Sequence, residues 1–548
     1  MRKCDLFLLT TNFNYQSFME PVGISILAAI AKKRGLAVEV LEPSILARSV
    51  EESTEIILNA KPRVVGISIL IDLHIDEILK MIKIIRMSCK DVIIFVGGQA
   101  ISMNYQQESY AMLIKEVDFF MFGESEYVFG ELIEAIINKS NWKKFRGIGY
   151  FENGCINTND AAPMVEDLNE LPEMDRSVLR EIISNTPSYH ETSIPYGRGC
   201  SKNCTFCSEV FFRKKSVPKV RRRKLDNVFR EMERLYNEYG IRSFNIEDES
   251  FLDVDAKEYI ELLEFLEKVE LLPESVELKI LGRIDCISDE LTKALYKSGV
   301  SYMFLGVDSV VDEDLKLFNK GYSSKMVYEK MDILLKNGYS LEVDSNHRVS
   351  TGYITWHPYT TIKGIRESYD FFKKYSNTPK LLQHKLIVFS STPLIDKIRK
   401  DGLLLVDNLP KGSYEYPWKF LHEDVSMLYD YMQRYFKEWT LVRDGIRTIE
   451  KYISMEKKEF ITESWQIKMY RKQLDHDFYE YFGKILEKTE KQEYEVLELI
   501  FNESCNCFQN YVKKIVNNID NFAKKIEFGL DIQDKLRTNN LWICRYRN

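Results

Sequence analysis

The sequence predicts an α/β protein in three parts: a doubly wound parallel sheet, a partial (β/α)6 barrel and a helical C-terminal domain. Segments typical of strands and helices alternate between residues 5 and 138, and the alternation resumes from residue 243 to residue 400. After Pro417 the chain is almost free of glycine and proline, and apolar residues recur at helical spacing. Alternation of this kind favours parallel sheets covered by helices, whereas the uninterrupted helical pattern favours a helical domain packed on the barrel.

The first domain, residues 1–144, is expected to carry a parallel sheet with helices on both faces. Its expected strands are apolar runs bounded by turns: Asp5–Thr10, Ala37–Leu41, Arg63–Leu70, Val92–Val96 and Phe119–Phe122. Its expected helices are Val22–Arg34, one closing at Ile56–Asn59, Ile75–Met87, one near Tyr105–Lys115, and Glu124–Asn138. Ligands in such sheets bind beyond the carboxyl ends of the strands.

A connector, residues 145–190, is expected to contain a hairpin that turns at Asn153-Gly154. The barrel, residues 191–405, follows it, and residues 406–548 form the helical domain. The expected barrel strands include Ser243–Ile246, Val276–Leu281, Tyr302–Leu305, Tyr353–Trp356 and Lys385–Phe389.

Composition limits the class of protein. Apolar residues make up 45% of the chain and aromatic residues 12%, which is enough for packed domains. A net charge of −7 argues against nucleic-acid binding, and the lack of any apolar run of about 18 residues argues against a membrane partner. The cysteines outside residues 200–207 lack the spacing of a disulfide framework, so we expect a reducing, cytoplasmic location.

Three of the ten cysteines lie within eight positions, in the stretch Gly197-Arg198-Gly199-Cys200-Ser201-Lys202-Asn203-Cys204-Thr205-Phe206-Cys207. Cysteine thiolates are the usual ligands of iron–sulfur clusters, and a short loop can present three of them to one cluster. Three protein ligands would leave one iron open to an external molecule. The alternative, structural zinc, normally requires four protein ligands, and the neighbouring sequence offers no fourth.

This Cys-x3-Cys-x2-Cys motif, with Phe206 directly before the third cysteine, resembles the signature of the radical S-adenosylmethionine (SAM) enzymes. The resemblance implies a 4Fe-4S cluster on Cys200, Cys204 and Cys207, whose open iron chelates SAM. Reduction of the cluster by an electron donor such as flavodoxin or ferredoxin then cleaves SAM to methionine and a 5'-deoxyadenosyl radical.

Four upstream turns resemble those of the Rossmann-like cobalamin-binding domain found in one subfamily of these enzymes. They are Pro21-Val22-Gly23, Val65-Gly66-Ile67-Ser68, Val96-Gly97-Gly98 and Phe122-Gly123-Glu124-Ser125-Glu126. Glycine lets the backbone approach a flat macrocycle closely. The resemblance implies cobalamin contacts from Gly23, Ser68, Leu70, Gly97, Gly98, Gly123 and Glu124. The alternative is a generic flavodoxin-like domain.

The Asp-x-His-x-x-Gly motif that gives cobalt a histidine in other cobalamin proteins is missing after the first strand. Asp72-Leu73-His74 follows a later strand and lacks the glycine, so His74 is either a cobalt contact or a surface residue beside a helix cap.

Polar residues at the ends of the barrel strands are the candidate SAM contacts. Asp248 and Glu249 resemble the pair that binds the SAM ammonium, and Arg283, Asp308 and Ser309 match positions that hold its carboxylate or ribose. The alternatives are an ordinary acidic turn and a barrel salt bridge. Strand ends of a barrel are where binding groups usually lie.

Many relatives carry Gly-x-Pro-Gly-Glu-Thr where this chain has Trp356-His357-Pro358-Tyr359-Thr360-Thr361. His357 and Tyr359 are therefore candidates for proton handling or substrate contact, with core packing as the alternative.

The resemblance implies a cobalamin-dependent radical SAM enzyme that methylates an unreactive carbon of a peptide or other secondary metabolite. One SAM would methylate cob(I)alamin, a second would yield the radical, and methylcobalamin would deliver the methyl group. The alternatives are a non-methylating cyclase or rearrangement enzyme, a non-catalytic cobalamin or redox sensor, and a tRNA methylthiotransferase-like enzyme. The basic run Arg213–Lys224 could bind tRNA in such an enzyme, but the acidic total favours a solvated loop or a phosphate-facing arginine.

Overall fold

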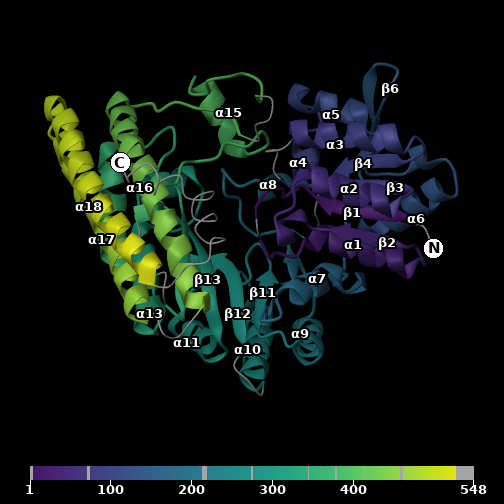
Figure 1. The fold of residues 1–548 in the computed structure, drawn as a ribbon, viewed down its shortest axis with the longest axis horizontal. Coiled ribbons are helices and arrows are strands. Elements are labelled where there is room, and N and C mark those ends of the chain that lie inside the picture. Colours follow the sequence, from purple (N-terminus) through teal and green to yellow (C-terminus); the bar gives the residue numbers. More distant parts are fainter. Residues whose placement is uncertain are drawn as a thin grey trace.

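The computed structural model describes residues 4–15, 17–70, 75–212, 219–272, 276–342, 345–376, 379–410, 413, 415–456 and 461–525. These residues form two large, mainly parallel sheets and a bundle of long helices, arranged in chain order from the N-terminal to the C-terminal side (Figure 1). In the described part of the chain, no helix is both long enough and apolar enough to cross a membrane.

The first sheet is a doubly wound parallel sheet with the strand order β2-β1-β3-β4-β5. Its strands are β1 (Leu6–Thr10), β2 (Val38–Leu41), β3 (Val64–Ser68), β4 (Ile93–Gly97) and β5 (Phe119–Met121). The helices are α1 (Val22–Lys33), α2 (Val50–Ala60), α3 (Ile75–Ser88), α4 (Gln99–Asn104), α5 (Ala111–Glu116) and α6 (Glu126–Ile137). Every residue of β1 is buried, as expected of a strand with helices on both faces.

The hairpin expected in the connector extends this first sheet. Strands β6 (Ile148–Glu152) and β7 (Cys155–Thr158) add to β5 in antiparallel register. Asn153 and Gly154 have φ angles of 53° and 82°, the left-handed pair that a two-residue hairpin turn requires. The sheet therefore continues past residue 144, where the sequence had placed its end.

The second sheet is the partial barrel, with the parallel order β14-β13-β12-β11-β8. Its strands are β8 (Glu191–Pro195), β11 (Ser243–Glu247), β12 (Glu277–Arg283), β13 (Val300–Asp308) and β14 (Arg348–Tyr353). The helices of this part are α9 (Leu225–Tyr239), α10 (Ala256–Glu270), α11 (Asp289–Lys297), α12 (Asp312–Leu317), α13 (Ser324–Lys336), α14 (Ile362–Tyr375) and α15 (Pro393–Lys400). The expected sixth strand is reduced to one bridge between Trp356 and Lys385.

The C-terminal helices are α16 (Glu423–Glu456), α17 (Ile461–Glu490) and α18 (Leu497–Lys525). Helix α17 packs on α14 of the barrel, where the Tyr369 hydroxyl donates a hydrogen bond to the carbonyl of Tyr479 at 3.1 Å. Trp418 and Trp439 are buried, so these aromatic side chains form core rather than an open cavity.

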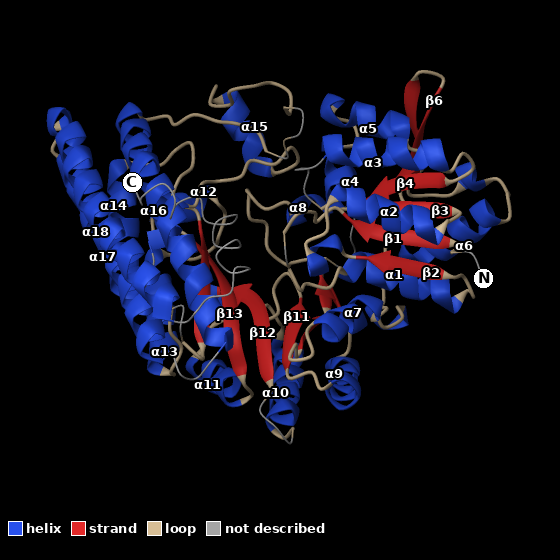
Figure 2. Ribbon diagram, in the orientation of Figure 1, coloured by secondary structure: helices blue, strands red, loops and turns tan. Residues whose placement is uncertain are grey.

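The carboxyl ends of both sheets face a common region. In Figure 2 the arrowheads of β1 and β4 point toward α8 (Glu209–Phe212), and the barrel strands rise toward the same region. A hydrogen bond of 2.7 Å from the Ser390 hydroxyl to the side-chain oxygen of Asn104 joins the two domains here. Ligands that bind beyond the strand ends of the two domains would therefore face each other.

Candidate functional site

The three-cysteine loop is anchored to the segment that follows α12. The amide of Thr205 donates to the carbonyl of Phe318 at 3.1 Å, and its hydroxyl donates to the carbonyl of Leu317 at 2.8 Å. The Thr205 carbonyl accepts a hydrogen bond of 2.9 Å from the amide of Leu394, at the start of α15. Backbone bonds on both sides of Thr205 thus fix the loop at the mouth of the barrel.

The cysteines of this loop suit a cluster that carries negative charge. Cys200, Cys204 and Cys207 form no disulfide among the described residues, and the Arg283 guanidinium lies 3.5 Å from the Cys204 sulfur. Burial raises the pKa of Cys207 to about 12, so the thiol stays protonated until a metal displaces the proton. The ring of Phe206 packs edge-to-face on Phe318 at 5.2 Å.

Across the described ranges, no three His, Cys, Asp or Glu side chains converge closely enough to ligate one metal ion. A four-iron cluster holds its thiolates apart at different corners, and three thiols spread along a loop match that requirement.

The two glycines beside Arg198 have no room for a side chain. A Cβ atom on Gly197 would lie 1.9 Å from Oδ2 of Asp248, and one on Gly199 would lie 2.1 Å from the carbonyl oxygen of Lys219. Gly199 also has a φ of 85°, in the region that favours glycine. The two glycines therefore let the backbone of the cluster loop pack directly against Asp248 and Lys219.

Asp248 and Glu249, the predicted ammonium contacts, have different environments. Asp248 is buried, and it accepts hydrogen bonds from the amide of Ser250 and, at 3.4 Å, from Arg222. Glu249 is exposed to solvent, and its carboxylate forms no hydrogen bond or ion pair with any described residue. Of the two, Glu249 is therefore the one whose carboxylate is available to a ligand.

We expect Glu249→Gln to stabilise the ligand-free protein at pH 7. The surrounding protein atoms, and then the charges of Asp248 and Glu247, raise the pKa of Glu249. The folded state thus binds this proton more tightly than the unfolded state, and stability falls as pH rises from the unfolded pKa of about 4 through the folded one. Because the side chain is open to water, we expect a gain of less than about 1 kcal/mol.

Urea denaturation at pH 7 and below pH 4 measures this effect, which should vanish at the lower pH. Glu264→Gln, on the exposed face of α10, is the control and should change neither value. A less stable Glu249→Gln protein at pH 7 would contradict the assignment.

Arg283 reaches the cluster loop, while Asp308 and Ser309 are engaged inside the barrel. The Arg283 guanidinium pairs with both oxygens of Asp285, at 2.9 and 3.0 Å, so the predicted barrel salt bridge is present. Asp308 is ion-paired with Lys320 and has a φ of 62°. Ser309 is fully buried. The contacts of Asp308 and Ser309 with SAM stay predictions, and their placement does not support them.

His357 and Tyr359 are both engaged with neighbouring side chains of the protein. His357 is fully buried, its Nε2 lies 3.0 Å from Oδ1 of Asp314, and its ring packs on Phe318. The Tyr359 hydroxyl donates to Asp401 at 2.8 Å, at the end of α15. These contacts correspond to the packing alternative, and a catalytic role for either residue stays a prediction without support from the geometry.

Several of the predicted cobalamin contacts lie at the carboxyl edge of the first sheet. Among the described residues other than chain neighbours, no atom lies within 4 Å of a Cβ built on Gly23 or Gly123. Leu70 follows β3 and is 48% exposed. Ser68 and Gly97 end the neighbouring strands β3 and β4, where they are paired in register. These positions fit a macrocycle laid over the edge, whereas His74 lies outside the described residues.

Gly98→Ala should destabilise the first domain by about 1–3 kcal/mol. Gly98 has φ 98° and ψ −177°, a conformation open essentially to glycine alone, and a Cβ there would lie 2.5 Å from the carbonyl oxygen of Ile69. Gly123→Ala is the matched control, because φ is also positive, at 74°, but the space is empty. Chemical denaturation should show a smaller loss for Gly123→Ala, and equal losses would contradict the clash.

Glu124 lies beside this edge, but its carboxylate is held by the second domain. It accepts hydrogen bonds from Arg221 at 2.5 and 2.9 Å and from the amide of Val165 at 2.9 Å. Burial works to raise the pKa of Glu124, but the hydrogen bonds from Arg221 and the charge of Arg198 lower it below its usual value. A cobalamin contact of this carboxylate stays a prediction.

In the described part of the basic run, residues 219–224, Lys219 and Lys224 are exposed, whereas the three arginines form ion pairs within the protein. Arg221 binds Glu124, Arg222 binds Asp248 and Glu258, and Arg223 binds Glu231. Residues 213–218 lie outside the described residues.

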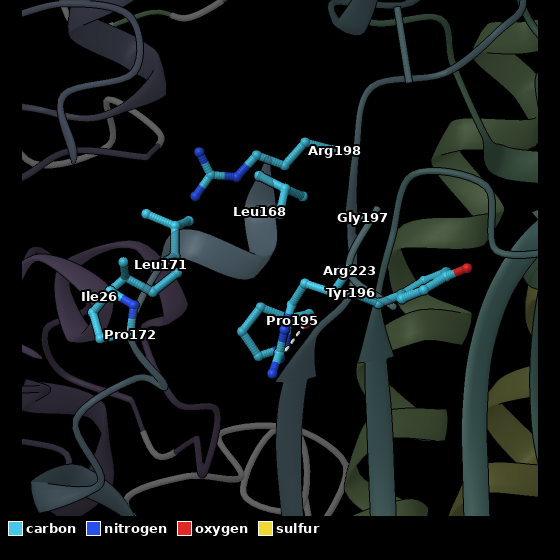
Figure 3. A pocket seen from close by; sticks show the side chains of 9 residues that line it. All are labelled: Ile26, Leu168, Leu171, Pro172, Pro195, Tyr196, Gly197, Arg198 and Arg223. Atoms are coloured by element: carbon cyan, nitrogen blue, oxygen red, sulfur yellow. Dashed lines mark hydrogen bonds between the residues drawn. The ribbon is translucent and has the colours of Figure 1, made fainter. Parts of the chain in front are cut away.

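A small pocket lies between α1, the connector and the segment Pro195–Arg198 that precedes the cysteines (Figure 3). Arg198 and Arg223 line it together with mostly apolar side chains.

Two family models match the chain. Residues 10–133 match the B12 binding domain, and residues 194–372 match the radical SAM superfamily. The first match runs from β1 into α6, and the second runs from the end of β8 into α14. The two domains predicted from the sequence are confirmed, in the predicted order.

Individual relatives are distant. An uncharacterized methyltransferase of Pyrococcus horikoshii is 22% identical over 328 residues, which are 58% of this chain and 67% of that protein. The hopanoid C-3 methylase of Methylococcus capsulatus is 23% identical over 335 residues, 60% of each chain. The chain thus matches about two thirds or less of the length of these relatives.

One solved structure matches almost the whole chain. The cobalamin-dependent S-adenosylmethionine radical enzyme OxsB with aqua-cobalamin bound has a TM-score of 0.78 at 15% identity, over 99% of this chain and 84% of that chain. The likeness includes the C-terminal helices, so the three-part fold is shared.

Proposed function

We propose that this chain, in which a B12-binding domain precedes a radical SAM domain, is a cobalamin-dependent radical SAM enzyme that methylates an unactivated carbon. The observation that carries the proposal is that the carboxyl ends of the two sheets face a common region. The three-cysteine loop lies on one side of that region and the glycine turns lie on the other. Two relatives named as a methyltransferase and a methylase support methyl transfer in particular.

An unactivated carbon has no lone pair with which to attack SAM. When bound, the cluster with SAM supplies a 5'-deoxyadenosyl radical, and cobalamin supplies a methyl group across a weak cobalt–carbon bond. In this proposal Cys200, Cys204 and Cys207 hold the cluster, and Glu249 accepts the SAM ammonium. Gly23 and Gly123 allow the backbone to approach the macrocycle.

The substrate we propose is a peptide or other secondary metabolite, bound at the open mouth of the barrel. Cluster reduction requires an external donor, for which flavodoxin or ferredoxin has the right chemistry. No disulfide joins any of the nine cysteines among the described residues, which favours a reducing cytoplasm.

Anaerobic reaction of the reconstituted protein with deuterated-methyl SAM, reductant and candidate metabolites tests the proposal by mass spectrometry. Methyl transfer predicts S-adenosylhomocysteine and 5'-deoxyadenosine in comparable amounts, with the label in a third product. Formation of 5'-deoxyadenosine alone would favour the alternative, a non-methylating rearrangement. That alternative is kept because the name of OxsB specifies radical chemistry and not methyl transfer. Formation of neither product would contradict both and favour a sensor.

A further inference from the structure

We propose that Arg198 is a positioning residue that sets the separation of the two cofactors, by tying the cluster loop to the cobalamin-binding edge. This inference rests on the proposed function only in requiring that both cofactors bind. Arg198 lies two residues before Cys200, in β9 (Gly197–Arg198). Its partners, Glu124 and Glu126, directly follow Gly123 at the carboxyl end of β5.

The ion pairs of Arg198 have the geometry of a specific contact. Its Nη2 donates to Oε1 of Glu126 at 2.6 Å, and its Nη1 lies 3.4 Å from Oε2 of Glu124. The side chains of Glu126 and Glu124 are only 9% and 17% exposed. A planar guanidinium that spans two partly buried carboxylates fixes direction as well as distance.

A second arginine makes the same connection from the adjacent strand. Arg221 lies in β10 (Arg221–Arg222), which pairs with β9 in antiparallel register, with Arg221 opposite Arg198. Arg221 binds both oxygens of Glu124, at 2.5 and 2.9 Å. The contact therefore balances two arginines of the second domain against two glutamates of the first.

The chain between the ion pairs of Arg198 and the cluster cysteines is short and tightly packed. Only Gly199 separates Arg198 from Cys200, and the backbone of Gly199 is packed against Lys219. On the other side Glu124 is adjacent to Gly123, whose amide is held by the Ser102 hydroxyl at 3.0 Å. A shift at the ion pair must therefore appear as a shift between the cluster and the glycine edge.

Electron paramagnetic resonance of the fully loaded protein measures this separation without a substrate. The reduced 4Fe-4S cluster and cob(II)alamin are both paramagnetic, so their dipolar coupling reports the distance between them. The variants are Arg198→Met, Arg198→Lys, Glu126→Gln and the double variant Arg198→Met/Glu126→Gln. The control is Arg366→Met. Arg366 is about as exposed as Arg198, at 29% against 26%, and forms a bidentate pair with Glu490 that joins α14 to α17.

We expect one sharp distance in the parent protein and in Arg366→Met, and a broadened or shifted distance in Arg198→Met, with iron and cobalamin contents unchanged. Arg198→Lys should restore part of the sharp distance, because it keeps one charged contact with Glu126. The double variant should match Arg198→Met alone, because both changes remove the same contact.

An unchanged distance in a fully loaded Arg198→Met protein would overturn the inference. Loss of cobalamin or cluster from this variant would also overturn it, because Arg198 would then act on stability. A parent protein that binds only one cofactor would instead contradict the proposed function, so the two failures are distinguishable.

Discussion

Replacing Cys204 by alanine should abolish the iron–sulfur cluster and every product of SAM cleavage. The loop supplies three thiols, and Cys204 is the most buried of them, at 8% exposure beside Arg283. With two thiolates left, a cluster that already has one open iron loses the ligand at its protected side. Iron and sulfide should fall from about four per chain to near zero after anaerobic reconstitution. Formation of 5'-deoxyadenosine should stop with it.

Cys286→Ala is the matched control for this change. Cys286 lies near the same loop, because the charges of Asp253 and Lys202 act on its thiol, and burial raises its pKa to about 12 as it does for Cys207. It is outside the Cys-x3-Cys-x2-Cys motif, so iron content and the broad visible absorption of the cluster should persist. Full iron in Cys204→Ala, or loss of iron in Cys286→Ala, would contradict the ligand set.

The order of elements was predictable because it depends on local patterns. The buried apolar runs, and Gly35 after the first helix, predicted β1 to β5 with small errors at their ends. The fate of Lys385–Phe389 was not predictable, because its pairing depends on where the C-terminal helices close the barrel. The hairpin at Asn153-Gly154 was visible as a turn, but its pairing with β5 is a contact between distant segments.

The sequence predicted at which strand ends the site residues lie, but not which of them are buried or which partners they contact. Asp248 and Glu249 are neighbours in sequence, yet Asp248 is buried against Arg222 and Glu249 is open to solvent. Both follow Glu247, the last residue of β11, so the alternation of side chains along a strand could not tell which of the two is buried. His357 looked available in the sequence because nothing near it shows that Asp314 and Phe318 lie against it. Arg198 was missed as a partner of Glu126 because 72 residues separate them.

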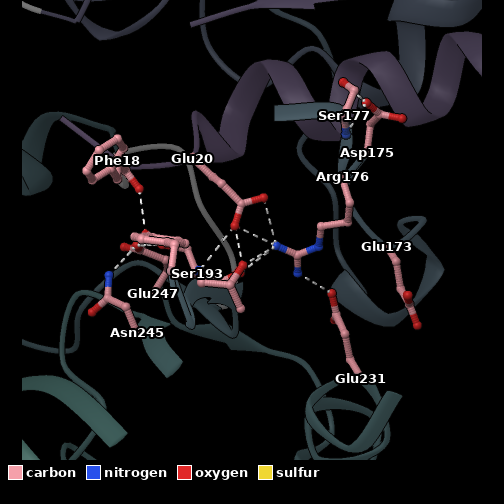
Figure 4. Close-up of polar contacts among 12 residues, drawn as sticks. Phe18, Glu20, Glu173, Asp175, Arg176, Ser177, Ser193, Glu231, Asn245 and Glu247 are labelled. Carbon is pink, nitrogen blue, oxygen red and sulfur yellow. Dashed lines mark hydrogen bonds and ion pairs between the residues drawn. The ribbon is translucent and has the colours of Figure 1, made fainter. Parts of the chain in front are cut away.

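The charges that join the two domains are mostly paired out of water. Besides the contact of Arg198, a second network surrounds Arg176, which precedes α7 (Ser177–Asn185) in the connector. Figure 4 shows Arg176 between Glu20 of the first domain and Glu231 of α9. Buried ion pairs add little net stability over an apolar core, but removing one partner leaves the other charge unpaired. We therefore expect the docking of the two domains to be weakened most by replacement of Arg176.

Arg176→Met should lower the free energy of unfolding by about 3–5 kcal/mol, the largest loss we expect from any single side chain at the junction. Arg176 is 4% exposed, and it donates to both oxygens of Glu20, at 3.2 and 3.0 Å, and to Glu231 at 2.8 Å. Glu231 would keep Arg223 at 2.7 Å, whereas Glu20 would keep no cationic partner among the described residues. Urea denaturation, followed by tryptophan fluorescence and by limited proteolysis of the connector, measures the loss.

Two further variants separate the unpaired charge from a simple loss of packing. Arg176→Met/Glu20→Gln removes the stranded carboxylate, so it should recover part of the stability lost in Arg176→Met. Arg234→Met removes an exposed arginine of α9 that pairs with Glu173 and Glu238, and it should cost no more than about 1 kcal/mol. If the double variant is no more stable than Arg176→Met, the loss comes from packing around the arginine stem. If Arg176→Met and Arg234→Met lose equal stability, the buried network does not hold the domains together.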